Sequence, residues 1–255
     1  MDEQQKQQGF FDGNPRQMFV FGLVSGIAAV LLTNNFLGLS YAQNGGNDDV
    51  AVVDDGEEPV AAPTTTTTKL SEAVNDEDHV RGDLKTAKVV MVEYSDFQCP
   101  YCERHHPTLE QVFDQYGDDI AWVYRHFPLS FHANAESAAL ASECAAEQGK
   151  FWEFADAMFD GQTGNLDGSA ATASAFYTAT AKDLGLNASK FESCVSSKKY
   201  QDKLDADMAS GRASGVSGTP ATFINGVLVT GSTGKSVGAA PASVFTSIID
   251  AALAK

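Results

Sequence analysis

Basic side chains are scarce in this chain of 255 residues. It contains 17 lysines and arginines against 34 aspartates and glutamates, which gives a formal net charge of -17. A surface of that sign repels phosphate groups, so the composition argues against nucleic acid or an anionic membrane surface as the main partner. We interpret the acidity as a contribution to solubility.

Charged residues are missing altogether from residues 17–47. Lys6 and Arg16 precede this uncharged segment, and only acidic residues follow soon after it. Basic residues on one side of an apolar segment favour retention of that side in the cytoplasm. The distribution therefore predicts a cytoplasmic tail over residues 1–17 and places the rest of the chain outside the cytoplasm.

Residues 18–42 are predicted to be a transmembrane anchor or a signal peptide. The apolar stretch continues through residues 36–39 and so reaches the roughly 20 residues that span a bilayer. Against this, Ser40, Tyr41 and Ala42 fit the small-x-small pattern of a signal cleavage site. We expect a membrane anchor through this N-terminal helix, with secretion after cleavage as the alternative.

Large apolar residues are nearly absent from residues 43–74. This segment holds glycines, a group of acids, two prolines and five consecutive threonines at positions 64–68. Such a composition offers little surface to bury. We expect a flexible acidic and threonine-rich linker, or, on composition alone, a glycosylated stalk.

The remaining segment, residues 75–255, has the composition of a folded domain. The apolar run at 89–92 predicts a buried strand, and the alternation at 120–127 predicts a second. A helix of the right length lies between them, which favours a parallel pair. Residues 221–230 contain two apolar runs separated by Asn-Gly, a strong hairpin signal, and a last helix is expected at 242–253.

Runs of β-branched residues are missing from residues 131–214, which are rich in alanine. Five helices are expected there, separated by glycines. The predicted domain is therefore an α/β fold that carries an inserted helical subdomain.

The first predicted strand leads into Cys99-Pro100-Tyr101-Cys102. Proline suits the first position of a helix, so Cys99 is expected at a helix N-terminus. Its sulfur should be exposed there, and the helix dipole should favour a thiolate. Cys102 lies one turn further on and can close a disulfide with it. The pattern predicts a redox-active dithiol; the alternative is a zinc site with His105 and His106. We expect no bound cofactor and no metal.

Four segments together resemble the DsbA-like thiol:disulfide oxidoreductases of the thioredoxin-like superfamily. They are Val92-Glu93-Tyr94-Ser95-Asp96-Phe97-Gln98-Cys99-Pro100-Tyr101-Cys102, Arg125-His126-Phe127-Pro128-Leu129, Cys144-Ala145-Ala146-Glu147-Gln148-Gly149-Lys150-Phe151-Trp152 and Gly218-Thr219-Pro220. The resemblance covers residues 75–255 and implies a thioredoxin-like fold, βαβ followed by ββα, with the helical insertion between the two parts.

The resemblance also implies roles for single residues. Pro220 would be a cis proline beside the dithiol, and Thr219 would face an extended peptide substrate. Glu93 would lie behind the site and exchange a proton with the inner cysteine; the alternative is an ordinary strand-end acid paired with a lysine or with water. Pro100 and Tyr101 would tune the reduction potential.

The other two cysteines, Cys144 and Cys194, lie in separate predicted helices of the insertion. Outside the cytoplasm a structural disulfide between them is the leading expectation. Two separate buried thiols remain the alternative.

These observations predict an extracytoplasmic thiol:disulfide oxidoreductase that introduces disulfides into exported proteins with free cysteines. Cys99 would form the mixed disulfide and Cys102 would resolve it. The resemblance implies a quinone-linked membrane partner that reoxidises the pair. Two alternatives stay open: a reductase or isomerase that uses the same site, and a non-catalytic peptide-binding module.

Overall fold

The computed structural model describes residues 64–255. The predicted tail and the predicted anchor or signal segment, residues 18–42, lie outside this part of the chain, as does the predicted linker up to residue 63. Within residues 64–255, no helix is both long and apolar enough to cross a membrane.

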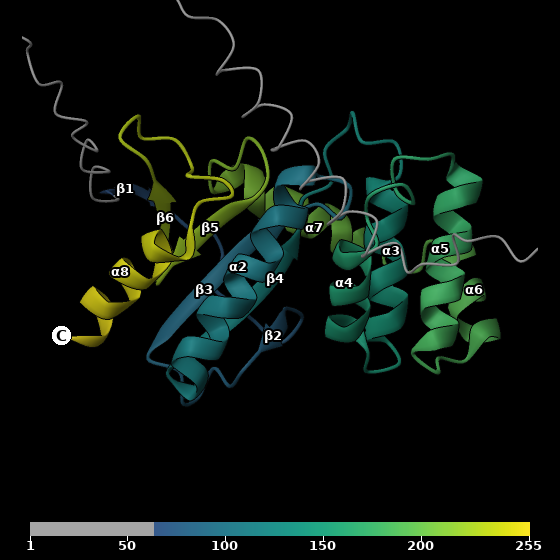
Figure 1. Ribbon diagram of the computed structural model, residues 1–255, viewed down its shortest axis with the longest axis horizontal. Helices are drawn as coiled ribbons and strands as arrows, with labels where there is room; N and C mark the ends of the chain where they lie inside the picture. Colours follow the sequence, from purple (N-terminus) through teal and green to yellow (C-terminus); the bar gives the residue numbers. More distant parts are fainter. Residues whose placement is uncertain (1–63) are drawn as a thin grey trace, which may run out of the picture. The chain divides into compact units, whose positions relative to one another are not determined.

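The domain is built on a mixed sheet of six strands in the order β1-β6-β5-β3-β4-β2 (Figure 1). The strands are β1 (Thr64–Lys69), β2 (His79–Arg81), β3 (Val89–Ser95), β4 (Ile120–His126), β5 (Ala221–Ile224) and β6 (Val227–Thr230). Only β3 and β4 pair in parallel within the described residues; the other neighbours are antiparallel. This is the predicted thioredoxin-like arrangement, and the α/β fold class is confirmed.

Seven α-helices and one short 3₁₀ helix complete the described part of the chain. They are α2 (Pro100–Tyr116), η1 (Gly117–Asp119), α3 (Ala135–Ala146), α4 (Phe151–Asp160), α5 (Ala170–Asp183), α6 (Ala188–Ser196), α7 (Gln201–Ala213) and α8 (Ala242–Leu253). Helices α3 to α6 gather beside the sheet (Figure 1) and form the helical insertion that the alanine-rich composition predicts.

Local signals in the sequence set several element boundaries. Ser169 and Asn187 cap α5 and α6, because their side chains accept hydrogen bonds from the free N–H groups of Thr172 and Lys190. The β5–β6 hairpin turns at Asn225 and Gly226, which both have positive φ.

The two faces of the central strands pack against different partners. Met91 and Trp122 belong to a buried cluster with Phe245 of α8, on the face that α2 and α8 cover. Val92 and Phe223 belong to a second buried cluster on the opposite face. Successive side chains of a strand point to opposite faces. The strand that leads to the dithiol is thus buried on both sides and holds the start of α2 in place.

Two strands were not predicted from the sequence. The predicted linker is wrong from residue 64 onward, since β1 pairs with β6, and Leu70 and Val74 pack against the buried cluster around Val92. Threonine is β-branched and favours extended backbone, which explains why a threonine run can form an edge strand. β2 has only three residues and pairs with β4.

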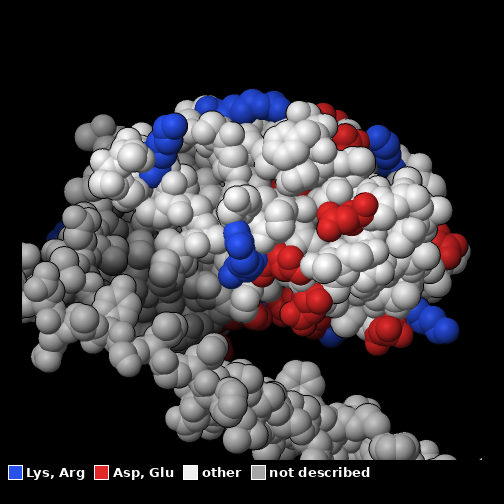
Figure 2. Space-filling model, turned by 45° about the horizontal axis from the view of Figure 1, so that its top comes forward, with Lys and Arg blue, Asp and Glu red and all other residues white. Residues whose placement is uncertain are grey.

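Figure 2 shows how charge is distributed over one face of the domain. Acidic side chains gather in groups on this face, while lysine and arginine side chains stand singly. The distribution agrees with the net charge of -17 for the whole chain.

Candidate active site

The Cys99-Pro100-Tyr101-Cys102 segment lies where β3 passes into α2. Cys99 is the N-cap residue of α2 and has extended backbone angles, φ -78° and ψ 120°, and Pro100 is the first helical residue. The carbonyl oxygen of Cys99 accepts the N–H groups of Cys102 at 2.9 Å and Glu103 at 3.1 Å. The sulfur of Cys99 therefore sits at the positive end of a helix of 17 residues.

This position makes Cys99 unusually acidic. Its pKa is lowered to about 6, chiefly by a hydrogen bond from the Cys102 thiol. Thr219 and the N–H groups of Cys102 and Tyr101 lower the pKa further, whereas burial opposes the shift. At neutral pH the thiolate is thus the main form of Cys99.

Cys102 has the opposite character. Its side chain is completely buried, and burial raises its pKa well above the ordinary range for a thiol. Its hydrogen bond to Cys99 and the nearby charges of Cys99 and Glu93 add to this shift. Both cysteines are free thiols in this structure. The pair therefore combines an outer thiolate with an inner thiol that holds its proton.

Cys99 is also less accessible than the sequence suggests. We expected an exposed sulfur, but the residue is only 3% exposed. It belongs to the same apolar cluster as Phe97, and its sulfur lies 3.5 Å from the carbonyl oxygen of Thr219. The expectation of an exposed Cys99 is therefore wrong, because the loop before β5 covers it.

That loop brings Thr219 and Pro220 to the dithiol. The Thr219–Pro220 peptide bond is cis. A pocket of about 440 Å³ borders the loop and is lined by residues 215–221, by Leu228 of β6 and by residues 234–236, among others. Thr219 and Pro220 form part of its lining, and Cys99 does not.

Glu93 lies inside β3 and has no exposed surface. The indole Nε1 of Trp122 donates a hydrogen bond of 3.2 Å to one carboxyl oxygen of Glu93. Burial raises the pKa of Glu93. Among residues 64–255 no lysine or arginine pairs with it, so it is neither a wet strand-end residue nor half of a surface ion pair.

The two central residues of the motif differ in their surroundings. Tyr101 is 56% exposed, and the guanidinium of Arg104 lies over its ring at 4.7 Å. Tyr101 acts on the Cys99 sulfur through its backbone N–H group. Pro100 is exposed at the first position of the helix.

Asp96 is a site residue that the sequence reasoning missed. One of its carboxylate oxygens accepts the N–H of Gln98 at 2.8 Å, and the other accepts the N–H of Leu129 at 2.9 Å and bonds Nδ1 of His132 at 2.7 Å. Its backbone carbonyl accepts the N–H of Cys99 at 3.0 Å. An acid directly after a buried strand is the only signal in the sequence, and it does not reveal the partners 33 and 36 positions away.

A family model described as thioredoxin matches residues 74–240. The chain belongs to the thioredoxin family. Among solved structures it is similar to DsbA2 of Pseudomonas aeruginosa, at 26% identity and a TM-score of 0.55, over 70% of this chain and 96% of that one. It is also similar to α-DsbA1 of Wolbachia pipientis, at 25% identity and a TM-score of 0.58, over 74% and 96% of the two chains. The DsbA-like resemblance is thus confirmed.

A third solved structure, a thioredoxin-like oxidoreductase from Silicibacter pomeroyi, has a TM-score of 0.59 at 23% identity. It covers 71% of this chain and 95% of its own. This thioredoxin-family protein therefore shares the fold of two structures named DsbA and of one named a thioredoxin-like oxidoreductase.

The curated relatives with similar sequences carry a different name. The chain is 39% identical over 153 residues to Na(+)/H(+) antiporter NhaA 1 of Mycolicibacterium vanbaalenii and 36% identical over 152 residues to NhaA 3 of Salinispora tropica. These matches cover 60% and 59% of this chain but only 24% and 22% of the antiporters. The matched part of this chain thus spans about a quarter of the length of those proteins.

Two clusters in the thioredoxin-family domain contain groups that can ligate metals. They are His79, His126 and Glu143, and His106, Glu110 and Asp156. In each cluster a basic side chain already pairs with a carboxylate. Lys203 lies 3.7 Å from Glu143, and Arg81 lies 2.7 Å from Asp156. We therefore interpret both clusters as ion-pair networks.

Neither cluster of the described residues includes a cysteine. Nε2 of His105 bonds the Thr222 hydroxyl at 3.0 Å, and Nε2 of His106 bonds Asp156 at 2.9 Å. Among residues 64–255, no group of possible metal ligands combines Cys99 and Cys102 with either histidine.

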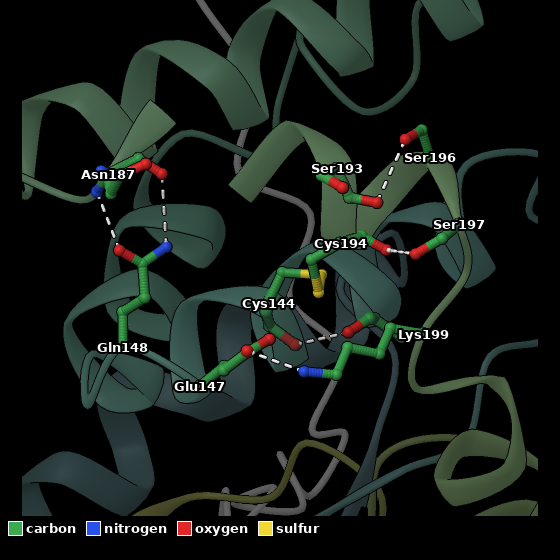
Figure 3. The surroundings of a disulfide bond; sticks show 11 residues. Cys144, Glu147, Gln148, Asn187, Ser193, Cys194, Ser196, Ser197 and Lys199 are labelled. Atoms are coloured by element: carbon green, nitrogen blue, oxygen red, sulfur yellow. Dashed lines mark hydrogen bonds and ion pairs between the residues drawn. A yellow bond between two sulfur atoms is a disulfide. The ribbon is translucent and has the colours of Figure 1, made fainter. Parts of the chain in front are cut away.

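The remaining cysteines form a bond within the insertion. Cys144 of α3 and Cys194 of α6 are joined by a disulfide, across 50 positions of the sequence (Figure 3). Contacts on both sides support the same junction: Lys199 pairs with Glu147 at 2.7 Å, and the Gln148 side chain accepts the N–H of Asn187 at 2.8 Å. This disulfide fastens α6 to α3 and takes no part in the dithiol site.

Proposed function

We propose that this protein is an extracytoplasmic thiol:disulfide oxidoreductase that introduces disulfides into exported proteins. The observation that carries the proposal is the asymmetry of the pair, in which the pKa of Cys99 is lowered to about 6 and that of Cys102 is raised. A stabilised thiolate stabilises the reduced form of the pair. The oxidised form is then the stronger oxidant.

The proposed reaction consists of two thiolate exchanges. A substrate thiolate attacks the sulfur of Cys99 in the oxidised pair, the Cys99–Cys102 bond breaks, and Cys102 leaves and takes up a proton. A second substrate thiolate then attacks the substrate sulfur of the mixed disulfide, and Cys99 leaves as a thiolate. Two substrate thiols are oxidised to a disulfide while the protein disulfide is reduced to the dithiol, so no bound cofactor is required.

The low pKa of Cys99 favours the second exchange, because a more acidic thiol is a better leaving group. The attacked sulfur would be that of Cys99, which keeps a small exposed surface, whereas Cys102 has none. Thr219, Pro220 and the adjoining pocket are the proposed binding surface for the substrate, whose extended backbone would pair with Thr219 as an added strand. Tyr101 would tune the reduction potential through its backbone N–H group, which lowers the pKa of Cys99. Pro100 would act by starting the helix directly after Cys99.

Several parts of the proposal concern the surroundings of the domain. The exported substrates would carry free cysteines, and a quinone-linked membrane protein would reoxidise the pair. Residues 18–42 would anchor the protein in the membrane or, as the alternative, direct its secretion. In either case the dithiol works outside the cytoplasm, where disulfides persist.

The direct test is the oxidative refolding of a reduced, unfolded ribonuclease. The oxidised protein should restore ribonuclease activity with the loss of one protein disulfide for each substrate disulfide formed, and Cys99→Ser should not. A wild type that instead reduces native disulfides would support the reductase or isomerase. A wild type that binds unfolded peptides as well as Cys99→Ser does, with no exchange, would support the peptide-binding module.

A further inference from the structure

Three polar atoms behind the dithiol are buried without a hydrogen-bond partner in the described part of the chain. They are the second carboxyl oxygen of Glu93 (Oε1), the hydroxyl of Ser95 and the hydroxyl of Tyr124. All three residues are completely buried. An unpaired polar group in the interior costs about 1–3 kcal/mol, so three such atoms in one place call for an explanation.

The sheet places these atoms on one face. Ser95 follows Glu93 by two positions in β3, so the two side chains point the same way. Tyr124 of β4 is the register partner of Glu93. Tyr124 and Cys102 belong to the same buried cluster, which packs against this face. The inner cysteine therefore shares a buried compartment with one carboxyl group and two hydroxyl groups.

Ser95 lies at the centre of this compartment. Its hydroxyl is near enough to lower the pKa of Glu93, Cys102 and Tyr124 by hydrogen bonding, yet no well-formed hydrogen bond fixes it to any of them. A hydroxyl can rotate, and it can accept one proton while donating another. Trp122 holds only Oε2 of Glu93, so Oε1 is the oxygen left for exchange.

We propose that the hydroxyl of Ser95 carries a proton between Cys102 and Glu93, and that Tyr124 donates the hydrogen bond that orients Ser95 for the transfer. This inference rests on the proposed function and deepens it. Cys102 must gain and lose a proton in every cycle, but it has no contact with solvent. A bare thiolate at this depth would be strongly disfavoured, so a buried route for the proton lowers the barrier.

The proton balance is the same in both directions. When a substrate thiolate attacks Cys99, Cys102 leaves with the electron pair of the broken bond and takes the proton of Ser95. Ser95 takes the proton of the Glu93 carboxyl group, which becomes a carboxylate. On reoxidation Cys102 gives its proton to Ser95 as its sulfur attacks the mixed disulfide at Cys99, and Ser95 gives its own proton to Glu93.

Stopped-flow reaction of the reduced full-length protein with dithiobis-nitrobenzoate tests this step. Attack by Cys99 releases a first coloured thiolate, and attack by Cys102 on the mixed disulfide releases a second. Ser95→Ala should leave the first release unchanged and slow the second by about 100-fold. Tyr124→Phe should slow the second by about fivefold, the effect of one hydrogen bond.

The pH profile separates proton transfer from a merely structural effect. In the wild type, the rate of the second release should increase with pH and become constant once Glu93 is ionised. In Ser95→Ala, this rate should keep rising by about tenfold per pH unit, because hydroxide is then the only base. Ser95→Thr keeps the hydroxyl and should restore the wild-type profile.

Matched controls are Ser142→Ala and Tyr177→Phe, which remove buried hydroxyl groups far from the dithiol in the sequence. Neither should alter either release. A Ser95→Ala protein with the rate and pH profile of Ser142→Ala would overturn the proposal, as would a variant in which both releases slow equally. If the wild type releases both thiolates but does not oxidise ribonuclease, the proposed function fails while the proton route stands.

Discussion

The sulfur of Cys99 lies 3.5 Å from the carbonyl oxygen of Thr219, a residue 120 positions further along the chain. This contact joins the start of α2 to the loop before β5, which carries the cis Thr219–Pro220 bond. We therefore expect a peptide that reacts with Cys99 to approach along this loop. The side chain of Thr219, rather than this carbonyl oxygen, is among the groups that lower the pKa of Cys99.

The rate at which iodoacetamide alkylates Cys99 should rise with pH as the thiolate forms, with a midpoint near pH 6. Cys102→Ala should move the midpoint upward, because the hydrogen bond from Cys102 is the largest cause of the low pKa. Cys102→Ser, which keeps a donor, should move it less. A wild-type midpoint near that of a free cysteine, about 8.5, would contradict the described geometry.

Glu93→Gln should change the pH dependence of stability. Burial raises the pKa of Glu93 above 4.5, so the folded state keeps its proton to higher pH than the unfolded chain does. Folding stability therefore falls as pH rises from the ordinary carboxyl range through the raised pKa, and the glutamine variant should lack this part of the fall.

Urea unfolding at several pH values measures this effect. The gain of Glu93→Gln over the wild type should be absent at about pH 4 and present at about pH 8. Glu192→Gln, at an exposed position, is the control. A constant difference across this pH range would show that Glu93 does not titrate with a raised pKa.

Asp96→Ala should destabilise the domain by about 3 kcal/mol, because the buried carboxylate accepts hydrogen bonds from Gln98, Leu129 and His132. Thermal or urea unfolding gives the value, and the exposed Asp160→Ala should stay within about 0.5 kcal/mol of the wild type. Equal effects of the two substitutions would mean that Asp96 does not hold the loop before Cys99.

Removal of the second disulfide should affect stability without affecting the dithiol. The double variant Cys144→Ala/Cys194→Ala frees a loop of 50 positions and should lose about 2–4 kcal/mol of unfolding free energy. The alkylation midpoint of Cys99 should stay unchanged, since the disulfide joins α3 and α6 within the insertion. A shifted midpoint would instead reveal coupling between the insertion and the active site.

Local signals explain what the sequence could predict. Pro100 at the first helical position and the spacing of Cys99 and Cys102 depend on neighbours in the chain, and they placed the dithiol at the start of α2. The turn at Asn225 and Gly226 is likewise encoded by two adjacent residues. The alanine-rich composition was sufficient to identify the helical insertion.

Pairings across long distances could not be predicted in this way. The composition of the threonine run at 64–68 is typical of a linker. It forms a strand because it pairs with β6, which is far away in the sequence. Asp96 finds its partners in a loop more than thirty positions away. The compartment around Ser95 forms only when β3 and β4 pair in register and α2 packs on them.

The reduction potential of the Cys99–Cys102 pair tests the central claim most directly. It is measured in glutathione buffers on the full chain, with alkylated peptides resolved by mass spectrometry so that Cys144 and Cys194 are followed separately. A drop in thiol pKa from about 7, as in thioredoxin, to about 6 raises the potential by only about 20 mV at neutral pH, so a large rise also requires other stabilisation of the dithiol. The account predicts a value well above the roughly −270 mV of thioredoxin, toward the roughly −120 mV of DsbA. A value at or below that of thioredoxin would contradict a disulfide donor and would indicate a reductase.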